Sequence, residues 1–214
     1  MSGYLYRPSG TGPSPAIVLL HGGGGIERYN LEWASWLASL GYVALAVDSG
    51  KLTPSQTIIT HAIGAAGYLR SLSFVAGDRL GIMGFSRGGA AALNAVTLRE
   101  AAAPEFRAAI LLYPAGCSYQ IKSTSVPLLL LLGERDGSPE PCTDMTKRLS
   151  ATSSVPVTLV LYPNAYHAFD NPEIRALTSI PWMPAVGLLY DERATSDAHE
   201  KVRQFFAQHV GIRQ

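Results

Sequence analysis

A serine lies in the stretch Gly84-Phe85-Ser86-Arg87-Gly88, directly after the apolar residues 80–83. This G-x-S-x-G pattern, where a strand passes into a helix, is typical of a nucleophilic serine held on a sharp turn above the end of a sheet. Glycine is expected at positions 84 and 88, because side chains there would collide as the helix folds back on the strand. A glycine-rich turn with an incidental serine has the same sequence pattern, so the interpretation depends on partners elsewhere in the chain.

A nucleophilic serine needs a histidine to remove its proton and a carboxylate to orient that histidine. His167 is the candidate base because it follows the strand-like run 157–162, and loops at the carboxyl ends of strands present functional groups in open α/β sheets. The remaining histidines either precede the serine, against the order serine, acid, histidine, or lie in helical patterns where we expect them on the surface. They are His21, His61, His199 and His209.

Asp136 is the candidate carboxylate, because it follows the buried-strand run 127–132 and lies between the serine and the histidine in sequence. Glu134 is closer to the end of that strand and remains an alternative. The charged and glycine neighbours of Asp136 would equally suit a solvated turn.

A run of four glycines at 22–25 follows the strand-like stretch 16–20. Glycines let backbone N–H groups face a cleft, where they bind the negative charge that develops on a substrate oxygen. We expect the N–H groups of Gly23 and Arg87 to form this oxyanion hole, with Gly24 as the alternative to Gly23 and as a substrate contact. A phosphate-binding loop would need a lysine followed by serine or threonine, and a dinucleotide loop a third spaced glycine; the run has neither.

With these parts, the chain resembles the dienelactone hydrolase family of the α/β-hydrolases along nearly its whole length. The motifs that carry the resemblance are Tyr4-Leu5-Tyr6-Arg7-Pro8, Leu19-Leu20-His21-Gly22-Gly23, Leu40-Gly41-Tyr42-Val43 with Val47-Asp48-Ser49, Gly84-Phe85-Ser86-Arg87-Gly88-Gly89, Leu132-Gly133-Glu134-Arg135-Asp136 and Tyr166-His167-Ala168-Phe169-Asp170. The resemblance implies Ser86 as nucleophile, Asp136 as acid and His167 as base.

Two features depart from that family's pattern. The name-giving enzymes use a cysteine nucleophile, and they carry an arginine shortly after the histidine, where this chain has Ala168-Phe169-Asp170-Asn171. These departures point away from dienelactone itself and toward a serine esterase.

We therefore expect a serine hydrolase that cleaves carboxylic esters through an acyl-enzyme. A lactone hydrolase or a peptidase with the same triad is the alternative. A catalytically silent binding module is a third hypothesis, but such modules usually lose a triad member and none is lost here. No insertion is long enough for a helical cap; only 171–194 could lean over the cleft, with Trp182 and Met183 as an apolar wall. Small or short-chain esters, from acetyl to butyryl, are the expected substrates. The two-step acyl-transfer chemistry requires no metal or organic cofactor.

Length and composition predict one domain over residues 1–214. A hydrophobic content of 47% with 15% charged residues suits a sheet buried on both faces. The net charge of +1 gives no basis for nucleic acid or an anionic membrane as partner. No apolar run approaches the roughly 20 residues of a membrane helix, and no signal-peptide pattern opens the chain. We expect a cytoplasmic monomer or homodimer that binds a small ester or lactone, unless a leader has been removed.

Strand-like and helical stretches alternate regularly, which predicts an α/β fold with a mostly parallel central sheet and helices on both faces; the resemblance makes it the α/β-hydrolase fold. Strands are expected at about 4–7, 16–20, 42–47, 79–84, 108–112, 127–132 and 156–162, and helices at about 27–40, 55–72, 87–99, 140–151 and 195–209. The last helix has a start signal at Asp197, with Glu200 three residues on, and Gly211 is its expected stop.

Cys117 and Cys142 each follow one of two neighbouring strands. Parallel neighbours are about 4.8 Å apart, so the two loops leave the same edge of the sheet close together. A disulfide needs Cα atoms within roughly 7 Å, which this placement allows. Two separate buried thiols are the alternative.

Overall fold

The computed structural model describes residues 2–97, 106–117, 120–137, 139–174 and 187–211, and its strands form a seven-stranded sheet. The strands are β1 (Ser2–Tyr6), β2 (Ser14–Leu20), β3 (Val43–Asp48), β4 (Val75–Phe85), β5 (Ala108–Leu112), β6 (Leu128–Gly133) and β7 (Val157–Tyr162). Their order across the sheet is β1-β3-β2-β4-β5-β6-β7. All neighbours pair parallel except β1, which runs antiparallel to β3 at the edge.

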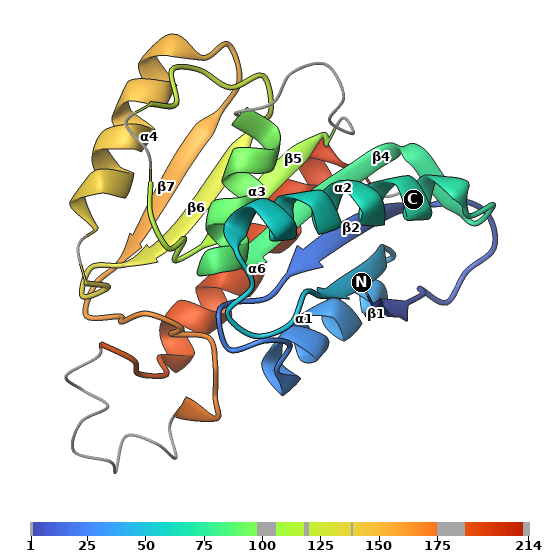
Figure 1. Ribbon diagram of the computed structural model, residues 1–214, viewed down its shortest axis with the longest axis horizontal. Coiled ribbons are helices and arrows are strands. Elements are labelled where there is room, and N and C mark those ends of the chain that lie inside the picture. Colours follow the sequence, from blue (N-terminus) through green and yellow to red (C-terminus); the bar gives the residue numbers. More distant parts are fainter. Residues whose placement is uncertain (1, 98–105, 118–119, 138, 175–186, 212–214) are drawn as a thin grey trace.

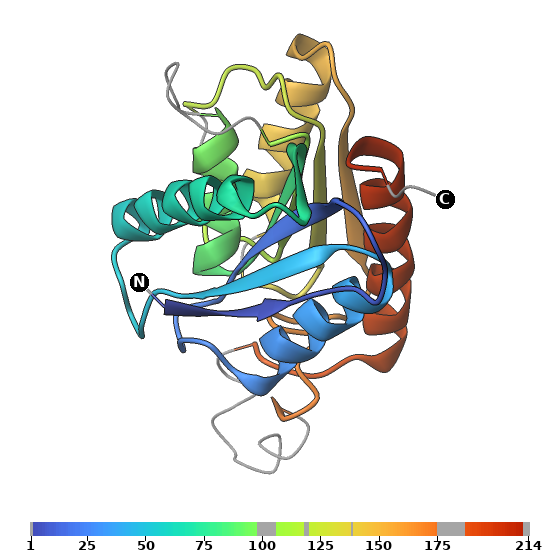
Figure 2. The same ribbon diagram turned by 90° about the vertical axis from the view of Figure 1, so that its right-hand side faces the viewer.

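Helices cover both faces of this sheet (Figures 1 and 2). They are α1 (Arg28–Ser39), α2 (Ser55–Ser71), α3 (Arg87–Thr97), α4 (Glu140–Thr152) and α6 (Glu192–His209). α2, α3 and α4 lie on one face, and α1 and α6 lie on the other. Covered on both sides, β2, β5 and β6 are buried almost throughout and are nearly continuous in apolar residues. The predicted α/β-hydrolase fold is confirmed.

The register of the sheet brings the carboxyl ends of its central strands to one edge. Gly84 of β4 pairs with Leu20 of β2, and the last residues of β6 and β7, Gly133 and Tyr162, pair with each other. The loops that follow these strands therefore begin side by side, although their residues are far apart in sequence. In the described part of the chain, no helix is both long and apolar enough to cross a bilayer.

The start of α6 was predicted wrongly. The N-cap is Asp191, whose carboxylate accepts the N–H groups of Arg193 and Ala194 at 3.0 and 2.9 Å. Asp197, the predicted start, lies inside the helix and accepts a hydrogen bond from Tyr162. The D-x-x-E pattern does not distinguish a capping aspartate from one that lies a turn and a half further along. The predicted stop is confirmed, because Gly211 has a φ of +78° and its N–H reaches the carbonyl of Phe206.

His199 was predicted on the surface of the last helix, and the structure contradicts this. Its ring stacks on that of Trp33 with 3.8 Å between centroids and 2° between planes, and it lies nearly perpendicular to the ring of Trp36, with 4.3 Å between centroids. Burial between α1 and α6 lowers the pKa of His199 to about 4. His199 shares a helix face with the buried residues Val202 and Phe206 and is part of the contact between the two helices.

Cys117 and Cys142 form a disulfide with 4.9 Å between their Cα atoms. The bond joins the loop after β5 to the first turn of α4, so the feasible pairing inferred from neighbouring strands is the one present.

Candidate active site

Ser86 stands between the last residue of β4 and the first residue of α3, with a φ of +50°. A residue other than glycine rarely adopts this backbone conformation, which costs on the order of 1–3 kcal/mol. The turn is as tight as its glycines imply. A Cβ on Gly84 would lie 2.2 Å from the carbonyl oxygen of Gly88, and one on Gly88 would lie 2.3 Å from that of Leu20. Side chains at positions 84 and 88 would therefore collide with the backbone, as the sequence predicted. The tight turn that the two glycines allow places the Ser86 hydroxyl at the open end of the sheet.

His167 connects this serine to Asp136. Its Nε2 lies 2.9 Å from Ser86 Oγ, and its Nδ1 lies 2.9 and 3.0 Å from the two carboxylate oxygens of Asp136. Since an ionised carboxylate only accepts, Nδ1 carries the proton and Nε2 is free to accept the serine hydroxyl proton. Both side chains are shielded, with 25% of His167 and 15% of Asp136 exposed.

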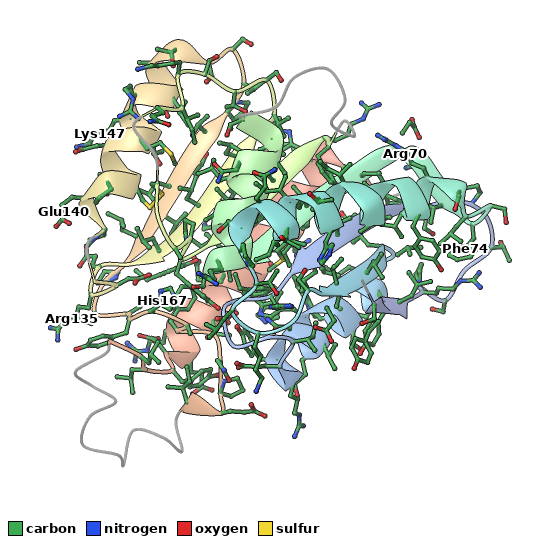
Figure 3. All side chains as sticks on the ribbon, viewed as in Figure 1. Arg70, Phe74, Arg135, Glu140, Lys147 and His167 are labelled. Carbon is green, nitrogen blue, oxygen red and sulfur yellow. A yellow bond between two sulfur atoms is a disulfide. The ribbon has the colours of Figure 1, made fainter. Side chains whose placement is uncertain are left out.

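The three side chains come from loops after β4, β6 and β7, which the sheet aligns at one edge. Figure 3 shows His167 within the loops at the carboxyl ends of the strands, whereas Arg135 points outward at the periphery of the same end. The main chain also holds His167, because its N–H donates to the carbonyl of Gly187 at 2.8 Å. Glu134, the alternative acid, is exposed, and its N–H bonds to the carbonyl of Tyr162. It is Asp136 that contacts the imidazole.

The glycine loop after β2 is held by His21, which sequence reasoning considered only as a base. His21 is 2% exposed; its Nε2 accepts the N–H of Ser49 at 3.0 Å, and its Nδ1 lies 2.6 Å from the carbonyl oxygen of Gly22. Because Nε2 is an acceptor, Nδ1 carries the proton and donates to Gly22. A histidine between a buried strand and a glycine run was the available signal for the role of His21.

His61, expected to be solvated, is partly buried and bonds to the Ser49 hydroxyl through Nδ1.

A cavity of about 410 Å³ opens over the serine. Its lining includes Ser86 and His167 together with Gly22, Gly23, Gly24, Glu27, Tyr29, Tyr113, Ala168, Asn171, Glu173, Ile174 and Leu188. Burial, and then the charge of Glu173, raise the pKa of Glu27, whose carboxylate also accepts a hydrogen bond from Asn171. Trp182 and Met183, the predicted apolar wall, lie outside the described residues.

A smaller cavity of about 180 Å³ lies against His167 and is also lined by Asp136, Leu132 and the two disulfide-bonded cysteines. Within the described residues, no group of three or more His, Cys, Asp or Glu side chains is arranged to hold a metal ion.

Comparison with known sequences gives a family. The sequence profile of the Dienelactone hydrolase family matches residues 1–50 and 47–210. The chain is 28% identical over 198 residues to a probable 2-oxo-3-(5-oxofuran-2-ylidene)propanoate lactonase of Bradyrhizobium sp.. That alignment covers 78% of this chain and 77% of the lactonase. The chain is 38% identical over 91 residues to acyl-coenzyme A thioesterase 3 of Mus musculus, over 40% of this chain and 20% of that protein.

Solved structures share the fold. A dienelactone hydrolase-like promiscuous phosphotriesterase from metagenomic libraries aligns with a TM-score of 0.76 at 21% identity, over 97% of this chain and 92% of that one. Esterase 2 of Thermogutta terrifontis, in a form phosphorylated by paraoxon, aligns with a TM-score of 0.74 at 17% identity, over 99% of this chain and 90% of that one. Since the family profile spans nearly the whole sequence, the chain belongs to the dienelactone hydrolase family and is an ester-cleaving hydrolase of the α/β-hydrolase fold.

Proposed function

We propose that the protein is a serine esterase that hydrolyses small carboxylic esters, with Ser86 as nucleophile, His167 as base and Asp136 as the acid that orients it. The observation that carries the proposal is the unbroken hydrogen-bonded path from Ser86 Oγ through both ring nitrogens of His167 to the Asp136 carboxylate. A serine hydroxyl is a weak nucleophile, and a base within hydrogen-bond distance is what activates it.

In the first half-reaction, His167 Nε2 takes the hydroxyl proton as Ser86 Oγ bonds to the ester carbonyl carbon. The tetrahedral intermediate collapses when the imidazolium gives that proton to the leaving alkoxide, which departs as the alcohol and leaves the acyl group on Oγ. In the second half-reaction, His167 takes a proton from water, the hydroxide adds to the acyl carbon, and the proton returns to Oγ as the acid leaves. Asp136 keeps the proton on Nδ1 and stabilises the imidazolium throughout.

The charge on the substrate oxygen would be held by the N–H groups of Arg87 and Gly23. Arg87 is the first residue of α3, so its N–H is one of those a helix cannot satisfy internally. The carbonyl of Gly22 is turned toward His21, and C=O and N–H point opposite ways across a trans peptide. The N–H of Gly23 therefore faces away from His21, toward the cavity that Gly23 lines. Gly24 lines the same cavity and is the alternative donor.

Short acyl chains are the proposed substrates because the cavity is small. At about 410 Å³ it is near the low end of ligand sites. Each methylene that stays in water forgoes roughly 0.8 kcal/mol of transfer free energy. We expect kcat/KM to be highest for acetyl to butyryl esters and lower for octanoyl esters.

A lactone is the second candidate substrate, favoured by the 28% identity to a probable lactonase. The same steps would open a lactone, with the leaving alkoxide remaining attached to the acyl group.

Nitrophenyl esters from acetyl to dodecanoyl, assayed beside lactones of similar size, test both proposals. The wild-type enzyme should show the short-chain maximum, and Ser86→Ala should lose nearly all turnover of every substrate it accepts. A steady rise of kcat/KM through dodecanoyl would contradict the small-ester proposal, and full turnover by Ser86→Ala would contradict the nucleophile.

A further inference from the structure

Asp170 is a buried carboxylate three residues after His167 that the steps above do not use. It is 2% exposed, and each of its oxygens accepts a hydrogen bond from a side chain. Trp33 Nε1 of α1 donates to Oδ2 at 2.7 Å, and the hydroxyl of Tyr113, just after β5, donates to Oδ1 at 2.5 Å. A buried charge is costly unless it is hydrogen-bonded, and here two neutral side chains and the backbone of Asp170 itself supply the donors.

Tyr113 connects Asp170 to the imidazole. Its ring lies 4.8 Å from the ring of His167, edge to face, and it lines the cavity over Ser86. Tyr113 is fully buried and has a φ of +35°, a conformation that its surroundings must impose. Its N–H donates to the carbonyl of Leu131 and its hydroxyl to Asp170, so both ends of the residue are fixed.

We propose that Asp170 is a positioning residue for ester hydrolysis, which holds Tyr113 against His167 and so keeps the imidazole between Ser86 and Asp136. The segment 167–170 is tied at both ends in this arrangement, by His167 to the catalytic edge and by Asp170 to α1 and β5. This inference rests on the proposed function, because positioning has meaning only if His167 is the base.

The charge state of Asp170 belongs to the same network. Burial raises the pKa of its carboxyl to about 6, against hydrogen bonds from Tyr113 and Trp33 and the nearby charge of His167, which lower it. The titratable or charged groups that face it are His167 on its own loop, Tyr113 after β5, Tyr29 and Glu32 on α1, Tyr190 before α6 and His199 on α6. Below pH 6, a proton on either oxygen makes that oxygen a poor acceptor, so one of the two donors loses its partner.

Asp170→Asn is the direct test, since it keeps the shape of the side chain and removes one acceptor. Asp197→Asn is the matched control, because Asp197 accepts a tyrosine hydroxyl in the same way, from Tyr162, without contacting His167. We expect Asp170→Asn to lower kcat by about 10- to 100-fold with KM within about threefold, as misplacement of a catalytic group does. The control should keep wild-type kcat.

The pH profile of kcat/KM separates positioning from folding. Below about pH 6 the kcat/KM of the wild type should fall more steeply than that of Asp170→Asn, because protonation of Asp170, whose pKa is about 6, removes an acceptor only where the aspartate is present. A kcat equal to that of Asp197→Asn, or a lowered kcat with a fall as steep as that of the wild type, would overturn the proposal.

If Asp170→Asn does not fold, Tyr113→Phe decides, because it keeps the ring against His167 and removes the bond to Asp170. The same loss of kcat and the same shallower fall below pH 6 would support the proposal, and wild-type kcat would overturn it. Ser86→Ala in the same assay distinguishes failure of the proposed function from failure of the positioning role. Full activity of Ser86→Ala would refute the proposed function. An inactive Ser86→Ala together with a fully active Asp170→Asn would refute the positioning role alone.

Discussion

Removing the Cys117–Cys142 disulfide should lower the free energy of unfolding by about 3.5 kcal/mol. The bridge closes a loop with a sequence separation of 25 residues. The chain-entropy relation for a loop of that length gives about 3.5 kcal/mol at 25 °C. For a protein of this size, each kcal/mol shifts Tm by about 2–4 °C, so Tm should fall by about 10 °C. In a reducing cytoplasm the same bond would be open, which makes the dithiol protein a form worth measuring.

Urea unfolding of the wild type with and without a reductant, beside the double variant Cys117→Ala/Cys142→Ala, measures this loss. The reduced wild type and the double variant should unfold at similarly lowered urea concentrations, and the reductant should not affect the double variant. Two titratable thiols in the unreduced, denatured wild type, or an unfolding midpoint that the reductant does not move, would refute the reasoning.

Three further predictions concern single residues. Asp136→Asn should lower kcat by about 10⁴-fold, while Glu134→Gln should stay within about twofold of wild type. If steady-state kinetics showed the reverse, Glu134 would be the acid in place of Asp136. His21→Ala removes the short hydrogen bond from the imidazole to the Gly22 carbonyl and keeps the longer one from the Gly25 N–H, at 3.3 Å. We expect kcat to fall about 10- to 100-fold with little change in KM, and an unaltered kcat would show that the backbone bond is enough to hold the loop. Since burial lowers the pKa of His199 to about 4, the folded state binds fewer protons than the unfolded state below about pH 6.5. The unfolding free energy of the wild type relative to His199→Phe should therefore fall as pH drops from 6.5 to 4 in urea titrations, and a pH-independent difference would contradict this.

The part of the structure that follows from local sequence was predicted well. Short apolar runs such as 128–132 are typical of strands covered on both faces, and their alternation with helical patterns predicted the parallel sheet. Because parallel strands end at one edge, residues after three different strands could be placed together before any distance was known. The structure brings Ser86, Asp136 and His167 into hydrogen-bond contact there.

Features that depend on long-range packing could not be predicted. Asp170 was assigned no role from the sequence, because its hydrogen-bond partners are 137 and 57 residues away, on α1 and after β5. His199 lies three and seven residues before Val202 and Phe206, at the edge of the buried stripe of its helix. Its stacking on Trp33 was missed because the stripe was identified from apolar residues alone. The start of α6 was misplaced because a capping pattern specifies neighbours along the chain and not where the preceding segment leaves the sheet.

Covalent labelling of Ser86 tests the central claim most directly. The folded protein should react with a fluorophosphonate probe to give one adduct per chain by intact mass, on the peptide that contains Ser86, and ester hydrolysis should be lost in proportion to labelling. Ser86→Ala should give neither adduct nor hydrolysis. Folded wild-type protein that hydrolyses esters but stays unlabelled, or an adduct that persists in Ser86→Ala, would contradict the account.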